Sequence, residues 1–143
     1  MNFAKIITRI GIAVTLAASG ISHAYLYIHG YQHIPTIGTA FLVQASVSLA
    51  LAALILVGGP AWLQWAAAML AGGSLVAFGL SRTVGLFGFS EHGWQPSPHA
   101  VLSLVAELLT VGLCAVYLVE GRRVRSSPQI AMSELSTGNA SVG

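Results

Sequence analysis

The sequence carries very little charge. Only 7% of its 143 residues are Asp, Glu, Lys or Arg, and aspartate is absent altogether. Soluble domains usually carry about 25% charged residues, so this chain lacks the polar surface that keeps a domain dissolved. Hydrophobic residues make up 55% of it, and the mean hydropathy is +0.79. The composition excludes an ordinary soluble domain and indicates a protein whose solvent is a lipid bilayer.

Other residues are too few for common kinds of chemistry. Cys114 is the single cysteine, so no intramolecular disulfide can form, and its apolar neighbours favour a packing role. Without aspartate there is no Ser-His-Asp arrangement, and the scattered glycines form no phosphate loop. The net charge of +2 comes from basic residues near the chain ends, which indicates membrane topology and no nucleic-acid partner. We expect a protein without catalytic activity of its own.

Four apolar segments each approach the ~20 residues that a helix needs to cross the hydrocarbon layer. Gly59 and Pro60 fit the start of the third segment, and Ser97 fits the N-cap of the fourth. Short connections place successive helices antiparallel. The predicted fold is an all-α, integral membrane, up-down-up-down four-helix bundle over residues 1–125, with crossings at about 6–28, 38–57, 61–81 and 98–119.

Lysine and arginine predict the orientation. Lys5 and Arg9 lie at the start of the first crossing, and Arg122, Arg123 and Arg125 follow the last. An even number of crossings puts both termini on one side, which the positive-inside rule makes cytoplasmic. We therefore expect a multi-pass protein of the cell membrane with cytoplasmic N- and C-termini.

The two ends of the chain carry further expectations. Residues 126–143 are rich in Ser, Thr, Gly and Asn and predict a disordered cytoplasmic tail. The N-terminal residues also fit a signal peptide cleaved near Ser19. We favour a membrane helix there, because the apolar character continues past that point.

Small residues predict where the helices pack closely, since they let backbones approach in lipid. They recur in the first crossing and in the third, at Ala13, Ala17 and Gly20 and at Ala68, Gly72, Gly73 and Ala77.

The polar residues of the crossings gather in the outer half of the predicted bundle. Glu107 lies near the midplane, where an ionised carboxylate costs about 2.5–3.5 kcal/mol, so it needs a partner, a proton or a watery pocket. Two interpretations stay open. One is a buried Arg82–Glu107 pair that fixes the helix register. The other is a pocket lined by Ser19, His23, Gln44, Arg82, His99, Ser103 and Glu107.

The five histidines raise the question of a metal or haem. His29, His33 and His92 are weak metal candidates, because no Cys, Asp or Met completes a ligand spacing; we read them as hydrogen-bonding residues at the membrane boundary. His23 and His99 lie at similar depth on two helices and are the candidates for axial haem b ligands.

The run SRTVGLFGFSEHGWQPSPHAVLSLVAELL, residues 81–109, resembles a family of small, uncharacterised four-helix bacterial membrane proteins. In that family the third helix ends in Ser-Arg-Thr-x-Gly-Leu and the fourth carries a glutamate, which match 81–86 and Glu107 here. The family often has proline next, where this chain has Phe87. More distantly, RIGIAVTLAASGISH is similar to DoxX-like proteins, some of which are membrane partners of redox enzymes.

Three functions follow as hypotheses. The first is a non-catalytic accessory subunit, with other membrane subunits as partners, or a self-associating bundle that forms a homo-oligomer. The second is a subunit of a redox complex that binds haem b or quinone in the outer-half pocket. The third is a small proton-coupled transporter or channel that uses Glu107.

Overall fold

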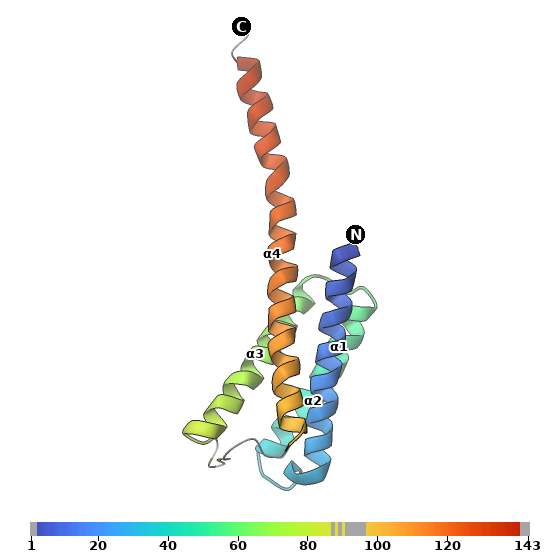
Figure 1. Cartoon of the computed structure of the whole chain (residues 1–143), viewed down its shortest axis with the longest axis vertical. Helices are drawn as coiled ribbons and strands as arrows, with labels where there is room; N and C mark the ends of the chain where they lie inside the picture. The colour runs from blue at the N-terminus through green and yellow to red at the C-terminus, as the bar shows by residue number, and fades with distance from the viewer. Residues whose placement is uncertain (1–2, 87, 89, 91–96, 141–143) are drawn as a thin grey trace.

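The computed structural model describes residues 3–86, 88, 90 and 97–140, with side chains as far as Gly121. The regular elements of this part are all helical (Figure 1): α1 (Phe3–Leu26), the π-helical turn η1 (Tyr27–Tyr31), α2 (Ile37–Leu56), α3 (Trp62–Thr83) and α4 (His99–Ala140). Four segments are long and apolar enough to cross a membrane, namely Phe3–Tyr31, Ile37–Leu56, Trp62–Thr83 and His99–Gly121. The predicted all-α, four-helix membrane bundle is confirmed.

The outward faces of these helices explain why the bundle belongs in lipid. In their most apolar windows, only 22% to 33% of the residues are buried inside the bundle. The remaining apolar side chains form a surface far larger than the patches that soluble monomers expose. In a bilayer, the same surface contacts the lipid tails while the helices satisfy their own backbone hydrogen bonds. The chain is a multi-pass membrane protein.

The fourth helix is longer than the apolar segment that predicts it. It runs to Ala140 and projects beyond the other helices in Figure 1. The sequence predicts disorder over 126–143, whereas the structure continues the helix as far as Ala140; residues 141–143 lie outside the described residues. A helix propagates through its own backbone hydrogen bonds, so a composition unsuited to a core does not prevent one.

We call the end of the bundle at which α1 begins the inner end, and the opposite end the outer end. Both termini lie toward the inner side in Figure 1. Near the inner end, buried apolar residues of all four helices form one cluster, which we call the inner core: Ile12, Ala13, Leu16, Leu51, Ala52, Ile55, Leu63, Ala67 and Cys114. The four helices are therefore joined tightly at this end.

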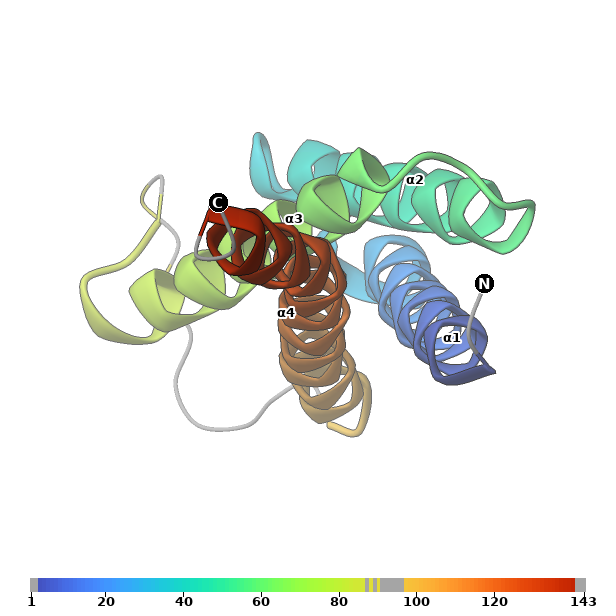
Figure 2. The same cartoon turned by 90° about the horizontal axis from the view of Figure 1, so that it is seen from above.

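Toward the outer end, α3 leaves the bundle. Its yellow-green end lies apart from α1, α2 and α4 in both Figure 1 and Figure 2. Because α2 and α3 meet mainly through the inner core, a space opens between them in the outer half. This divergence creates the site described below.

The small residues of α1 and α3 have different surroundings. A Cβ at Gly20 would lie 3.1 Å from both Leu49 and Ser48, so α1 and α2 approach closely there, as predicted. At Gly72 and Gly73 a Cβ would meet nothing within 4 Å. The close approach predicted through these glycines of α3 is absent from the described bundle, because α3 tilts away from its neighbours.

Arg9 joins two helices at the inner end. Its Nη2 atom donates hydrogen bonds to the carbonyl oxygens of Ile55 (2.9 Å) and Gly59 (3.1 Å). Ile55 lies in the last turn of α2 and Gly59 in the link that follows it. Backbone acceptors at the C-terminal end of a helix have no partner within the helix, and a cation is favourable there. A residue that the sequence marks as a topology signal is therefore also a helix cap.

Candidate functional site

Glu107 is the centre of a polar cluster between α1, α3 and α4. Its side chain is almost fully buried. Ser74 donates to its Oε1 atom at 2.7 Å and Ser19 at 3.1 Å, while Nε2 of His23 lies 3.7 Å from the same oxygen. Hydroxyl donors thus offset part of the cost of placing a carboxyl group at this depth.

The second oxygen of the carboxyl group is in a different position. All the contacts above are to Oε1, and no described residue hydrogen-bonds to Oε2. Glu107 also lines a cavity. Oε2 is therefore the atom of this group that is available to a bound molecule.

His23 is held in a defined orientation. Its Nδ1 atom lies 2.9 Å from the carbonyl oxygen of Ser19, and since a carbonyl only accepts, Nδ1 carries the hydrogen. In the neutral ring, Nε2 is then an unprotonated nitrogen facing Oε1 of Glu107. Two lone pairs facing each other at this distance are unfavourable, so the pair favours one proton, held by either His23 or Glu107. The His23–Glu107 pair is suited to holding and exchanging that proton.

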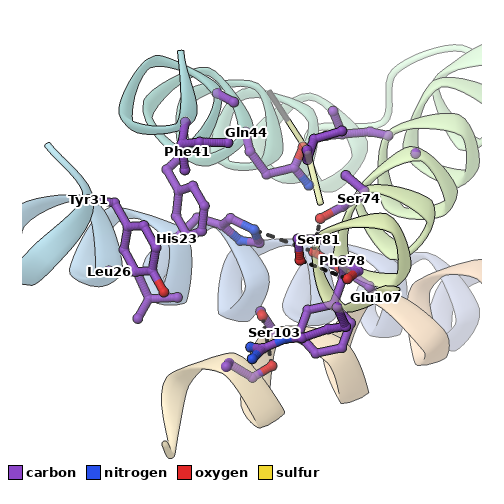
Figure 3. Close-up of a pocket in the computed structure, with 18 of the residues that line it drawn as sticks. His23, Leu26, Tyr31, Phe41, Gln44, Ser74, Phe78, Ser81, Ser103 and Glu107 are labelled. Carbon is purple, nitrogen blue, oxygen red and sulfur yellow. Dashed lines mark hydrogen bonds and ion pairs between the residues drawn. The ribbon is translucent and has the colours of Figure 1, made fainter. Parts of the chain in front are cut away.

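The cavity has a volume of about 330 Å³ and lies in the outer half of the bundle, with residues of all four helices around it. This is near the lower end of the range of about 300–1,000 Å³ that is typical of small-molecule sites. Aromatic rings contribute to its largely aliphatic wall, and His23, Gln44 and Glu107 supply polar groups (Figure 3). The cavity is suited to a flat, largely apolar group with a few polar atoms.

Gln44 is a cavity residue with a buried hydrogen-bond donor. It lines the cavity from α2, and its Nε2 atom is buried without a hydrogen-bond partner among the described residues. Ser103 also lines the cavity, but its hydroxyl donates to the carbonyl of Ala100 at 3.1 Å, so its free lone pairs accept. A buried amide without a partner is costly, and a ligand oxygen would remove that cost.

A π-helical turn contributes to the aromatic wall. Tyr31 is the last residue of η1, where the amide of Gln32 donates to the carbonyl of Tyr27 at 3.0 Å. This i to i+5 turn holds more residues than an α-helical turn, which returns Tyr31 to the side of the helix that carries His23. The Tyr31 ring stacks on Phe41 with centroids 4.5 Å apart, and both rings line the cavity.

Arg82 lies in a different place from the one that a direct pair with Glu107 requires. It lines the same cavity, but its guanidinium lies over the Phe78 ring, 4.8 Å from the centroid. Ser74 precedes Arg82 by eight residues on α3, about 12 Å at 1.5 Å per residue, and Glu107 is at the depth of Ser74. The structure replaces the expected Arg82–Glu107 pair with a Ser74–Glu107 pair.

The predicted pocket is otherwise largely assembled. His23, Gln44, Arg82, Ser103 and Glu107 line the cavity, and Ser19 bonds to Glu107 from behind its wall. His99 does not line it.

The His99 ring instead stacks on the Tyr25 ring, with centroids 3.9 Å apart. The His29 ring also stacks on Tyr25, again with centroids 3.9 Å apart. Haem needs two axial nitrogens that converge on one iron, whereas His23 faces Glu107 and His99 faces Tyr25. The residues therefore do not fit haem b.

The metal candidates do not converge either. His29 lies in η1, and its Nδ1 atom bonds to the carbonyl of Tyr25 at 2.9 Å. Within the described part of the chain, no three His, Cys, Asp or Glu residues are placed to hold a metal ion. His33 belongs to that part, while His92 lies outside the described residues.

The sequence analysis did not predict the roles of four residues in these contacts. Ser74, Tyr31 and Phe41 belong to the site, and Arg9 caps α2. Only Ser74 left a usable signal: it precedes Ser81 by seven residues, two helical turns on the same face of α3.

Fold and site together define a four-helix membrane protein with a buried histidine–glutamate pair at the base of an outer-half cavity. No family model matches the chain, and no curated protein or solved structure is significantly similar to it.

Proposed function

We propose that this protein is a non-catalytic membrane subunit that binds the ring of a lipid-soluble quinone or quinol in the cavity. One observation supports this: two polar atoms without partners among the described residues, the acceptor Oε2 of Glu107 and the donor Nε2 of Gln44, belong to residues of one small, mostly apolar cavity. A quinol hydroxyl donates to the first, and the ring's other oxygen accepts from the second.

The walls and the proton pair fit the same ligand. Tyr31, Phe41 and Phe78 line the cavity with aromatic side chains, and contacts between aromatic groups are favourable beyond the area that they bury. A quinone takes up protons when it is reduced, and the His23–Glu107 pair lies beside the ring position. The electrons are exchanged with a redox group of another protein, so we place this chain as an accessory subunit beside a partner enzyme.

The inner core argues against a transporter or channel that uses Glu107. Below Glu107 on α4, the Thr110 and Thr15 hydroxyls lie 2.8 Å apart. Beyond them the inner core includes Ile12, Leu16 and Cys114, each at most 1% exposed. These closely packed apolar side chains lie between the cavity and the inner end, as a binding site needs and a continuous ion path does not.

The orientation belongs to the same proposal. Lys5 and Arg9 lie at the inner end of the bundle, and the basic run 122–125 follows the last crossing at that end. The positive-inside rule then puts the inner end in the cytoplasm. We place the protein in the cell membrane with both termini cytoplasmic and the cavity in the outer leaflet.

Two glutamines allow a matched test. Gln44 and Gln64 both have a buried amide nitrogen without a partner among the described residues, but only Gln44 lines the cavity. The full chain in nanodiscs is titrated with radiolabelled decylubiquinone. Gln44→Leu is expected to weaken binding about tenfold, the effect of one lost hydrogen bond of ~1.4 kcal/mol, and Gln64→Leu to leave it unchanged. Equal effects of the two changes, or no binding by the unaltered protein, would overturn the proposal.

A further inference from the structure

Apolar side chains of the described residues pack at both ends of the cavity. On the inner side lies the inner core. On the outer side, Leu26, Tyr31 and Ile37 are each at most 7% exposed and form a second cluster, against which Ile34, Phe41 and Leu86 pack. We call this cluster the outer cap. Its buried, apolar side chains make this part of the outer end a poor route for a molecule arriving from water. Ser81 and Arg82 of α3 also line the cavity.

The side of the cavity between α2 and α3 is different. Ala40, Met69 and Gly73 line the cavity and are also exposed on the outside of the bundle. Met69 is 74% exposed, and a Cβ at Gly73 would meet nothing within 4 Å. These three residues therefore border an opening in the wall, which we call the lateral mouth.

The lateral mouth lies at the depth of the lipid tails. Gly73 is eleven residues from Trp62 and ten from Thr83, the two ends of α3. At 1.5 Å per residue it is about 15 Å from each end, close to the middle of a hydrocarbon layer that is ~30 Å thick. A molecule that passes the mouth comes from the bilayer and not from water.

We propose that the ligand enters through the lateral mouth from the lipid phase, and that its apolar tail remains there, extending past Gly73 and Met69 into the bilayer. This rests on the proposed function and narrows the ligand class to ring compounds with a long hydrocarbon chain. The cavity accommodates only the ring because its volume is about 330 Å³. Gly73 is the residue that leaves room for the tail, since any side chain there would project into open space at the mouth.

Adjacent glycines provide the matched variants. At Gly72, as at Gly73, a Cβ would meet nothing within 4 Å, but Gly72 does not line the cavity. Gly73→Leu and Gly72→Leu therefore add the same side chain to the same helix, and only the first adds it at the mouth. Cys114 is fully buried, so protection of its thiol from a maleimide reports that each variant is folded.

The experiment compares decylubiquinone with the same ring lacking its side chain, by equilibrium binding to the full chain in phosphatidylcholine nanodiscs. Gly73→Leu is expected to weaken decylubiquinone about tenfold or more, equivalent to ~1.4 kcal/mol, and to change binding of the tail-free ring less than about twofold. Gly72→Leu is expected to match the unaltered protein for both compounds.

Each other outcome has a distinct meaning. If Gly73→Leu leaves decylubiquinone binding unchanged, or weakens both compounds equally, the lateral mouth is overturned while the proposed function stands. If the unaltered protein binds neither compound, the proposed function fails and takes this inference with it.

Discussion

The hydrogen bond between Ser74 and Glu107 leads to a prediction that separates the observed site from the pair that the sequence favoured. We expect Ser74 to be energetically coupled to Glu107 and Arg82 not to be. The first double-mutant cycle combines Ser74→Ala with Glu107→Leu. The second combines Arg82→Met with the same Glu107→Leu change. Cycles are needed because removing a buried carboxyl group can itself stabilise a protein.

The size of the coupling follows from the geometry and the solvent. Hydrogen bonds to charged groups contribute about 1.5–3 kcal/mol in soluble proteins. Within membranes, interhelical bonds average ~0.6 kcal/mol and reach ~1.7 kcal/mol, because unfolded segments find other partners there. The Ser74 bond is short, 2.7 Å, and largely buried, so we expect about 1 kcal/mol. For Arg82 and Glu107 we expect less than ~0.5 kcal/mol, the usual limit of additivity.

The assay is unfolding in mixed dodecyl maltoside and dodecyl sulfate micelles, followed by circular dichroism and by maleimide labelling of the buried Cys114. A fitted free energy of unfolding for each of the variants gives both coupling energies. If the Arg82 cycle has the larger coupling, or the Ser74 cycle is additive, the assigned network around Glu107 is incorrect.

Two further predictions use the same assay. Arg9→Met removes the two bonds to the carbonyls of Ile55 and Gly59 and is expected to cost about 1–2 kcal/mol of unfolding free energy; an unchanged midpoint would mean that Arg9 serves topology alone. Gly20→Leu introduces a Cβ with side-chain and backbone atoms of α2 only 3.1–3.2 Å away and is expected to cost about 1–3 kcal/mol. Gly72→Leu, at an open position, is the control and should be near neutral, so equal losses would contradict the close approach of α1 and α2.

The proposed function depends on an arrangement that neither helix pattern nor composition reveals. Glu107 is satisfied on one oxygen and open on the other, and the adjacent cavity exists because α3 tilts away from α2. The tilt of a single helix therefore opens the cavity on which the proposed function depends.

The helices were predictable because insertion into a bilayer depends on local composition. The transfer free energy of a segment is close to a sum over its own residues, so the predicted crossing at 38–57 and the observed helix Ile37–Leu56 nearly coincide. The same local periodicity put Ser19 and His23 on one face of α1, where both contact Glu107. Wherever a property follows from spacing within one helix, the sequence was sufficient.

The partners of Glu107 on other helices were not predictable in this way. Whether Ser74 or Arg82 reaches the carboxyl group depends on how far α3 slides, rotates and tilts against α4, which the packing of all four helices decides together. The position of Tyr31 depends on a π-helical turn, and the opening at Gly73 on the divergence of α2 and α3. These features arise from contacts between segments far apart in the chain, and the residues of a single helix carry too little information to place them.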